Sequence, residues 1–379
     1  MKKLPIGIQN FREIIEGDYL YVDKTQCVYN LIDDIKYNFL SRPKGFGKSL
    51  LIDTIAEVFG GDRELFRGLW IYDSGYGFAK HPVIRLDMSE IANETEEILE
   101  KSLMERLGAI YFAEGLERKG ETAHSAFMRL IMLLHAKYNK RVVVLIDDYD
   151  KPILDHIDDF ETAAKNRPLL LDFYGLLKSM DAHLHFMLIT GMTRFTNATV
   201  FASGLNNLYD LTMSRKSAGL CGIPENSLCE HFGEYLEGLG RDEAFCQHEN
   251  MADEIAAWYG GYSWDGKTRL LNPYSLLNFF AEGKFKEYWQ AANLPKFFIE
   301  EAKRRPKSFS ELNDFAVSDR LLNIYEIERL EIEPFLFHTG YLTVKKVERT
   351  RGPDTCILDI PNREVREAFG RQVVAALGM

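Results

Sequence analysis

The sequence lacks the long apolar segments that membrane and secreted proteins carry. No apolar run approaches the length of about 18 residues that a transmembrane helix needs. The N-terminus begins with a basic stretch, MKK, as a signal peptide would. It lacks the apolar segment and the small-residue cleavage site that should follow. We therefore expect neither a membrane-spanning protein nor a secreted one.

Metal-binding and disulfide patterns are also missing. The five cysteines are widely spaced and odd in number, and none forms C-x-x-C, so the sequence indicates neither a zinc site nor a disulfide framework. The nine histidines show no ligand spacing. His183 and His185 would share one face of a strand, where a structural role is favoured over a metal. A reducing, cytoplasmic location is the simplest interpretation.

Acidic side chains outnumber basic ones. The chain has 46 Lys and Arg against 57 Asp and Glu, which gives a formal net charge of −11 at pH 7. Non-specific binding to nucleic acid or to anionic lipid needs clustered basic side chains, so both partners are disfavoured. The cluster KRRPK at 303–307 leaves local contact with nucleic acid open, although a solvated loop is the default interpretation.

The order of the apolar segments predicts an α/β protein with a doubly wound parallel sheet. The run RVVVLIDDYD at 141–150 is too continuous for a half-exposed strand, so we expect it to be buried on both faces. Helical patterns separate the strand candidates, and this alternation is typical of βαβ units. The predicted strands are 37–40, 81–89, 141–150 and 184–194, with 208–213 as a candidate fifth.

With 379 residues, the chain is long enough for two domains. After about residue 215 the pattern changes to helical segments rich in aromatics, which we interpret as core and interdomain packing. The segments 335–348 and 355–362 suggest a hairpin, followed by a closing helix. The predicted domains are 1–215 and a mainly helical 216–379, which we expect to be lid-like and to include a winged-helix element.

The stretch SRPKGFGKSL contains a degenerate phosphate-binding loop. The usual pattern is G-x-x-x-x-G-K-[ST], and Arg42 stands where its first glycine belongs. In such a loop, backbone N–H groups and a helix N-terminus face phosphate oxygens, the lysine reaches the β- and γ-phosphates, and the hydroxyl ligates Mg²⁺. Alone, the tripeptide GKS could arise by chance. The predicted nucleotide-binding residues are Arg42, Pro43, Lys44, Gly45, Phe46, Gly47, Lys48, Ser49 and Leu50.

A second motif supports the first. The buried strand candidate ends in two adjacent acids, Asp147 and Asp148, about a hundred residues after the loop. This is the arrangement called Walker B. We predict that Asp147, together with Ser49, holds Mg²⁺ and that Asp148 polarises the attacking water.

A third polar segment, LITGMTRFTN, follows the next strand candidate. In P-loop ATPases with an extra strand between the loop strand and the Walker B strand, that extra strand ends in a polar residue near the γ-phosphate. Thr190 or Thr193 could fill this role, and Arg194 could supply positive charge to the transition state, in cis or to a neighbouring subunit. The alternative is an ordinary polar strand-to-loop transition.

Taken in order, these segments resemble the bacterial AAA-ATPase-like family. The resemblance is carried by IIEGDYLYVDKTQCVYNLI, FLSRPKGFGKSLLIDTI, VVVLIDDYDKPI, ITGMTRFTNATVFASGLNNLYDLT, WYGGYSWDG and FLFHTGYLTVK, and it runs along nearly the whole chain. In that family the loop typically reads R-P-x-x-F-G-K-S, so Arg42 is a family trait. Members are often fused to a C-terminal restriction-endonuclease-like domain.

Three departures from the family pattern affect the expected function. The family usually has Asp-Glu where this chain has Asp147-Asp148, and the shorter side chain predicts slow hydrolysis. Only Lys44 follows Pro43, where the family usually has two basic residues. After residue 330 we find Asp354 and Asp359 but no E-x-K pattern, so we expect no nuclease domain in this chain.

The sequence therefore predicts an ATP-binding protein that uses Mg²⁺ and hydrolyses ATP. The alternative is a slow or inactive nucleotide-dependent switch that presents a surface to a partner or to a nuclease module. A DNA-associated effector is a third interpretation, which the net charge disfavours. A protein partner and self-association are both left open. Tyr21 and the residues after it, YVDKT, would lie near the adenine or brace the sheet edge.

Overall fold

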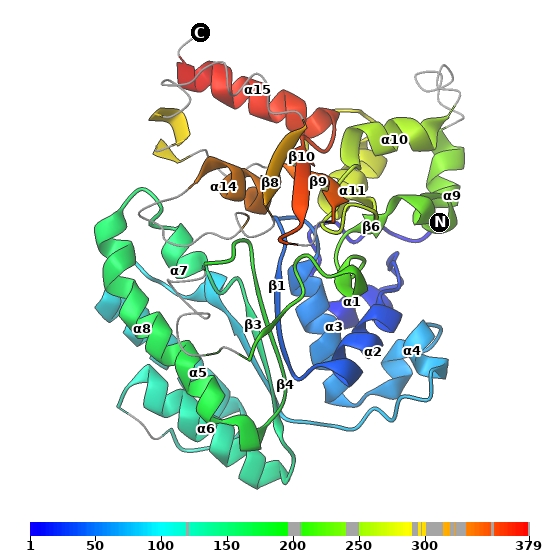
Figure 1. Ribbon diagram of the computed structural model, residues 1–379. Coiled ribbons are helices and arrows are strands. Elements are labelled where there is room, and N and C mark those ends of the chain that lie inside the picture. The colour runs from blue at the N-terminus through cyan, green and yellow to red at the C-terminus, as the bar shows by residue number, and fades with distance from the viewer. Residues whose placement is uncertain are drawn as a thin grey trace.

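A parallel five-stranded sheet forms the centre of the molecule (Figure 1). The strand order is β2–β3–β4–β1–β5, and each neighbouring pair is parallel. The strands are β1 (Tyr37–Ser41), β2 (Val83–Asp87), β3 (Val142–Asp147), β4 (Leu184–Gly191) and β5 (Tyr209–Asp210). The predicted α/β sheet is confirmed. In it, β4 lies between β1, which precedes the phosphate-loop motif, and β3, which ends in the acidic pair.

The computed structural model describes most of the chain. The described residues are 1–118, 121–195, 205, 207–239, 250–289, 295–296, 298–300, 314–318, 322, 331–349 and 352–377. The basic cluster at 303–307 lies outside them. Among the helices within these ranges, none combines the length and the apolar character needed to cross a membrane.

Helices cover both faces of the sheet and bury alternate strand residues. One face packs Val143 and Leu145 against α1 (Phe11–Glu16), α2 (Thr25–Asp34), α3 (Lys48–Gly60) and α4 (Trp70–Asp73). The other face packs Val142 and Val144 against α5 (Glu96–Ala113), α6 (Ala123–Tyr138) and α8 (Phe160–Ser179). Every residue of β3 is buried, as the continuous β-branched run predicted.

The C-terminal part combines helices with small antiparallel sheets. Its described helices are α9 (Leu228–Leu239), α10 (Met251–Tyr259), α11 (Pro273–Glu282), α14 (Ile332–Thr339) and α15 (Arg363–Leu377). Its strands are β6 (Ile223–Pro224) with β7 (Leu270–Leu271), and β8 (Phe315–Ser318), β9 (Thr343–Glu348) and β10 (Thr355–Asp359). The predicted domain boundary at 215 falls in the short turn Arg215–Ser217.

Two local predictions are wrong. The segment beginning at Phe335 was expected to open a hairpin, but it forms the last part of α14, which ends at Gly340 in a left-handed conformation. The hairpin consists of β9 and β10 only. His183 and His185 do not share a strand face, because His183 lies in a turn before β4. The two histidines contact different rings, His135 and His81 respectively.

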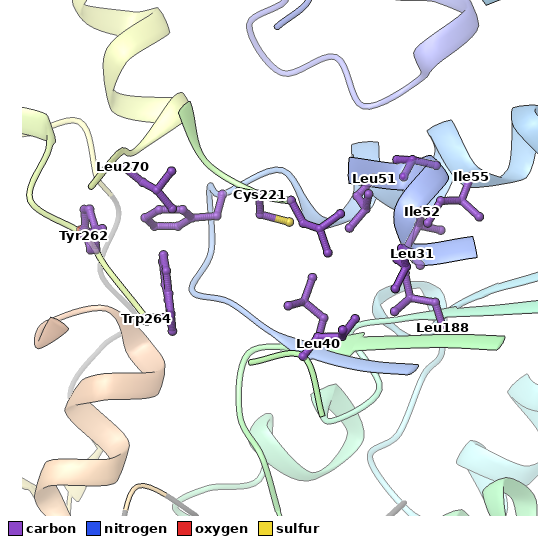
Figure 2. Close-up of a cluster of buried hydrophobic side chains, with 14 of the residues drawn as sticks. Leu31, Leu40, Leu51, Ile52, Ile55, Leu188, Cys221, Tyr262, Trp264 and Leu270 are labelled. Atoms are coloured by element: carbon purple, nitrogen blue, oxygen red, sulfur yellow. The ribbon is translucent and has the colours of Figure 1, made fainter. Parts of the chain in front are cut away.

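A single hydrophobic core joins the two parts of the chain. It extends from α3 along one face of the sheet to Tyr262, Trp264 and Leu270 in the C-terminal part. Figure 2 shows Tyr262, Trp264 and Leu270 at one end of this cluster, with Cys221 between them and Leu51 of α3. The C-terminal part is therefore packed onto the loop region through an apolar interface.

A buried carboxyl group lies within the C-terminal part. Glu364, at the start of α15, is fully buried, and its Oε1 accepts hydrogen bonds from the backbone N–H groups of Tyr288 (2.7 Å) and Trp289 (2.8 Å). Burial raises the pKa of Glu364 to about 7, against the opposing effect of these hydrogen bonds.

This raised pKa predicts a pH-dependent stability. The folded state binds the Glu364 proton more tightly than the unfolded state, so its stabilising contribution is present at low pH and is lost as pH rises through about 7. Glu364→Gln should therefore raise the free energy of unfolding at pH 8 by about 1–3 kcal/mol and change it little at pH 5, measured by urea denaturation. Glu367→Gln, an exposed site on the same helix, is the control. Equal effects at both pH values would contradict this account.

Candidate nucleotide-binding site

The loop between β1 and α3 has the shape of a phosphate-binding loop. Gly45 (φ 83°) and Gly47 (φ 88°) are both left-handed, a conformation that glycine adopts without the penalty of a Cβ atom. Gly47 is the N-cap residue of α3 and has no side chain that could accept hydrogen bonds from the first N–H groups of the helix. The unpaired N–H groups and the positive end of the helix dipole therefore lie at the loop.

Lys48 and Asp148 are brought together at this loop. The Lys48 ammonium donates to the carbonyl oxygens of Arg42 (3.1 Å) and Pro43 (3.5 Å). Its Nζ is also 3.7 Å from Oδ1 of Asp148. The lysine side chain is thus folded across its own loop, and its charge is partly balanced by an acid at the end of β3. Such an arrangement can open toward an anionic ligand, because a phosphate would replace weak carbonyl contacts.

Asp147 is buried beside the loop and has spare acceptor capacity. Its Oδ1 accepts a hydrogen bond from the Thr190 hydroxyl. Burial and the charge of Asp148 raise the pKa of Asp147, whereas Lys48, Ser49 and Thr190 lower it. Its Oδ2 is buried, and no group within the described ranges makes a hydrogen bond to it. An orphaned carboxylate oxygen near a serine hydroxyl is a donor set that suits Mg²⁺, so Ser49 and Asp147 fit the predicted metal.

The three polar residues predicted at and beyond the end of β4 have different partners in the structure. Thr190 contacts Asp147, whereas the Thr193 hydroxyl and N–H both donate to Asp150. Arg194 forms an ion pair with Asp210 of β5, with Nε 2.7 Å from Oδ2. Thr190 is therefore the residue of this group that touches the predicted magnesium site.

Asp150 was not predicted from the sequence. It lies two residues beyond the predicted acidic pair and is fully buried, and its carboxylate binds the turn that follows β4. The only sequence signal is a third acid in IDDYD. That signal does not reveal its partner, which lies more than forty residues away.

Arg42 fixes the entry to the loop. Its guanidinium is fully buried, with Cζ 4.1 Å from the centroid of the Trp264 ring. Its Nη1 donates to the carbonyl oxygens of Ser41 (2.8 Å) and Thr212 (2.9 Å). Burial lowers the pKa of Arg42 to about 10. The side chain thus packs against the C-terminal part, and the backbone carbonyl is the group that contacts Lys48.

The C-terminal part contacts the rest of the loop as well. Phe46 is buried with its ring centroid 4.7 Å from that of Tyr262, and its carbonyl accepts from the Gly222 N–H at 2.9 Å. The Gly45 carbonyl accepts from the N–H of Tyr274 at 3.4 Å. A Cβ atom at Gly340 would lie 2.9 Å from Cβ of Pro43, so α14 ends directly against the loop.

Two cavities flank the loop. The first, of about 100 Å³, is mainly apolar and is lined by Tyr21, Val22, Gly47, Leu50, Cys221 and Leu277. Tyr21 and its neighbours therefore line a cavity beside the loop. The second, of about 140 Å³, has both charged and apolar lining residues. It includes Lys44, Asp148, Asp150, Lys151 and Met192, and we call it the polar cavity after its charged side chains. Of the predicted loop residues, Leu50 thus lines the apolar cavity and Lys44 the polar one.

The fold is consistent with that of P-loop NTPases in which an extra strand, here β4, lies between β1 and β3. Comparison with known proteins gives a family. Residues 5–201 match the family described as Predicted AAA-ATPase. The chain belongs to this family.

One curated relative is similar along almost the whole chain. It is an "Uncharacterized protein in vnfD 5'region" from Azotobacter chroococcum mcd 1, 37% identical over 374 residues. The match covers 98% of this chain and 70% of that protein. The similarity to this relative therefore includes the C-terminal part of the chain as well.

The two left-handed glycines provide a matched test of the loop's packing. Replacement by alanine imposes a similar backbone penalty at both, of about 1–2 kcal/mol. At Gly45 the new Cβ would also lie 3.1 Å from Cβ of Tyr274 and 3.2 Å from Oδ1 of Asn272, whereas at Gly47 it would meet nothing within 4 Å. Gly45→Ala should therefore cost about 1 kcal/mol more in free energy of unfolding than Gly47→Ala, by urea denaturation. Equal costs would show that Tyr274 and Asn272 of the C-terminal part do not pack tightly against the loop at Gly45.

Proposed function

We propose that the protein binds ATP with Mg²⁺ and hydrolyses it to ADP and phosphate. One observation carries this proposal: Lys48, Asp148 and the Asp147–Thr190 pair converge at the carboxyl ends of β1, β3 and β4. In parallel α/β sheets, ligands bind at this edge. The family match supports nucleotide binding, and the arrangement of charges supports catalysis.

The two cavities suggest how the nucleotide would lie. The apolar cavity beside Tyr21 and Leu50 would take the base, because its lining offers flat apolar contact. The phosphates would then follow the loop toward the polar cavity at Asp148. Lys48 would exchange the carbonyl oxygens of Arg42 and Pro43 for phosphate oxygens.

Each acid at the end of β3 would have a separate role. Ser49 and Asp147 would hold Mg²⁺, which supplies charge neutralisation when bound. Asp148 would orient a water molecule for in-line attack on the γ-phosphorus and accept its proton. The bond from the γ-phosphorus to the bridging oxygen breaks, leaving ADP, while Lys48 stabilises the charge that develops. Thr190 would keep Asp147 in position through its hydrogen bond.

A nucleotide-dependent switch is the second candidate. Asp148 has a left-handed backbone (φ 48°), a conformation in which aspartate is favoured over glutamate. The C-terminal part also contacts the loop at Arg42, Gly45 and Phe46. Slow turnover combined with a lid packed on the loop would suit a protein that signals its nucleotide state to a partner.

The lysine provides the direct test of the proposal. Lys48→Ala should weaken Mg²⁺·ATP binding by at least about tenfold and reduce phosphate release by about a hundredfold, because the charge facing the β- and γ-phosphates is lost. Binding would be measured by calorimetry and turnover by phosphate release. Lys216→Ala, which removes an exposed lysine paired with Asp34, is the control. Normal binding and turnover by the Lys48 variant would refute the proposal.

Asp148 distinguishes an ATPase from a switch. Asp148→Glu should raise kcat by about three- to tenfold if hydrolysis is limited by the reach of the shorter acid. The KM for ATP should stay within about twofold, because Asp148 is not proposed to bind the base or the α-phosphate. Asp148→Asn should bind ATP without turnover. An unchanged low kcat in the glutamate variant would favour the switch.

A further inference from the structure

A single carboxylate holds the turn that follows β4. Oδ2 of Asp150 accepts hydrogen bonds from the backbone N–H groups of Met192 (3.2 Å) and Thr193 (2.6 Å), and from the Thr193 hydroxyl. Asp150 is fully buried, at 1% exposure. All three donors belong to two consecutive residues, so this one side chain determines where the Met192–Thr193 turn lies.

Tyr149 supports the same turn from the adjacent position. Its backbone N–H donates to the Thr190 carbonyl at 3.0 Å. Its hydroxyl donates to the carbonyl of Thr193 (3.3 Å) and accepts from the N–H of Phe195 (3.2 Å). Two neighbouring residues after β3 therefore bind a segment that starts at Thr190 and ends at Phe195.

The segment after β3 packs so closely against the end of β4 that a side chain at Gly191 would have no room. A Cβ atom at Gly191 would lie 2.5 Å from the Tyr149 ring and 2.6 Å from Oδ1 of Asp150. Only glycine permits this contact, since any side chain would force Tyr149 or Asp150 to move. The position of Asp150 is thus determined by packing as well as by hydrogen bonds.

Asp148 lies next to one of these contacts, the Tyr149–Thr190 backbone hydrogen bond. Its backbone is constrained on one side by β3, which ends at Asp147, and on the other by the Tyr149–Thr190 hydrogen bond. Between these fixed points it adopts a left-handed conformation, and its carboxylate lies 3.7 Å from the Lys48 ammonium. Asp148, Asp150 and Met192 line the same polar cavity.

Holding the turn with a buried carboxylate costs desolvation free energy. Burial raises the pKa of Asp150 to about 6, even though the Thr193 hydrogen bonds lower it. No cation forms an ion pair with Asp150 among the residues that the structure describes. A charge kept at such a site suggests a purpose other than stability.

We propose that Asp150 is a positioning residue that fixes the Met192–Thr193 turn and, through it, the placement of Asp148 for attack on the γ-phosphate. The proposal rests on the proposed ATPase function. Asp150 acts through its neighbours and does not touch the nucleotide. Its loss should therefore lower kcat and leave nucleotide affinity nearly unchanged.

The test compares two aspartates that each accept hydrogen bonds from the N–H and the hydroxyl of a threonine, one buried (Asp150) and one exposed (Asp159). Asp150→Asn should lower kcat by about ten- to a hundredfold while the KM for Mg²⁺·ATP stays within about twofold. Asp159 also accepts from the N–H (3.3 Å) and the hydroxyl (2.8 Å) of a threonine, Thr162, but it does so at the N-terminus of α8. Asp159 is the N-cap of α8, where asparagine caps about as well as aspartate, so Asp159→Asn should leave both kinetic constants unchanged.

A double-mutant cycle identifies the path of the effect. If Asp150 acts through the turn, Thr193→Val, which removes one of the three donors, should lower kcat by itself. The double variant should then lose much less than the product of the two single losses. Multiplicative losses, or a kcat loss in Asp159→Asn equal to that in Asp150→Asn, would overturn the proposal.

Hydrogen exchange tests the positioning without turnover. In the nucleotide-free protein, Asp150→Asn should speed exchange of the Met192 and Thr193 amides by at least about tenfold, and Asp159→Asn should not. Unchanged exchange at these amides would overturn the proposal. If the wild-type protein releases no phosphate, the proposed function fails, and the catalytic role of Asp150 falls with it. The exchange result then decides whether Asp150 fixes the turn.

Discussion

The buried charge of Arg42 is the constraint on which the loop geometry depends. Taking a guanidinium out of water is costly, and here the compensation is partial. Nη1 donates to two carbonyl oxygens and the face of Trp264 packs on the guanidinium, whereas Nε and Nη2 have no hydrogen-bond partner among the described residues. These partners come from β1, from the segment after β5 and from the C-terminal part. One side chain therefore joins three regions where a standard loop has only a glycine. The phosphate loop cannot move at its entry without disturbing the packing of the C-terminal part.

Three acids within four residues have different surroundings, and their proposed roles follow from those surroundings. Asp147 is buried with one free oxygen, which suits a metal ligand. Asp148 faces Lys48 across the polar cavity, which suits a group that handles water. Asp150 is saturated by donors from one turn, which suits positioning. The three proposed roles of the same residue type thus differ because burial and hydrogen bonding differ at each position.

Patterns that are local in the sequence predicted much of this arrangement. The β-branched run at 141–150, the GKS tripeptide at a strand-to-helix junction and the acidic strand end gave the sheet and the Lys48–Asp148 site. What the sequence could not predict depends on partners distant in the chain: Arg42 with Trp264, Arg194 with Asp210, and Asp150 with Thr193. The C-terminal part of α14, from Phe335 to Thr339, was mistaken for the start of a hairpin because a short apolar run is ambiguous and burial overrides local preference.

A crystal structure with Mg²⁺ and a non-hydrolysable ATP analogue would show directly whether the loop binds the phosphates. The Lys48 ammonium should leave the carbonyl oxygens of Arg42 and Pro43 and contact the β- and γ-phosphates. Mg²⁺ should lie between Ser49 and Asp147, and the base should occupy the cavity beside Tyr21. A nucleotide bound elsewhere, or a Lys48 side chain that stays folded on its own loop with the analogue present, would contradict the proposed binding.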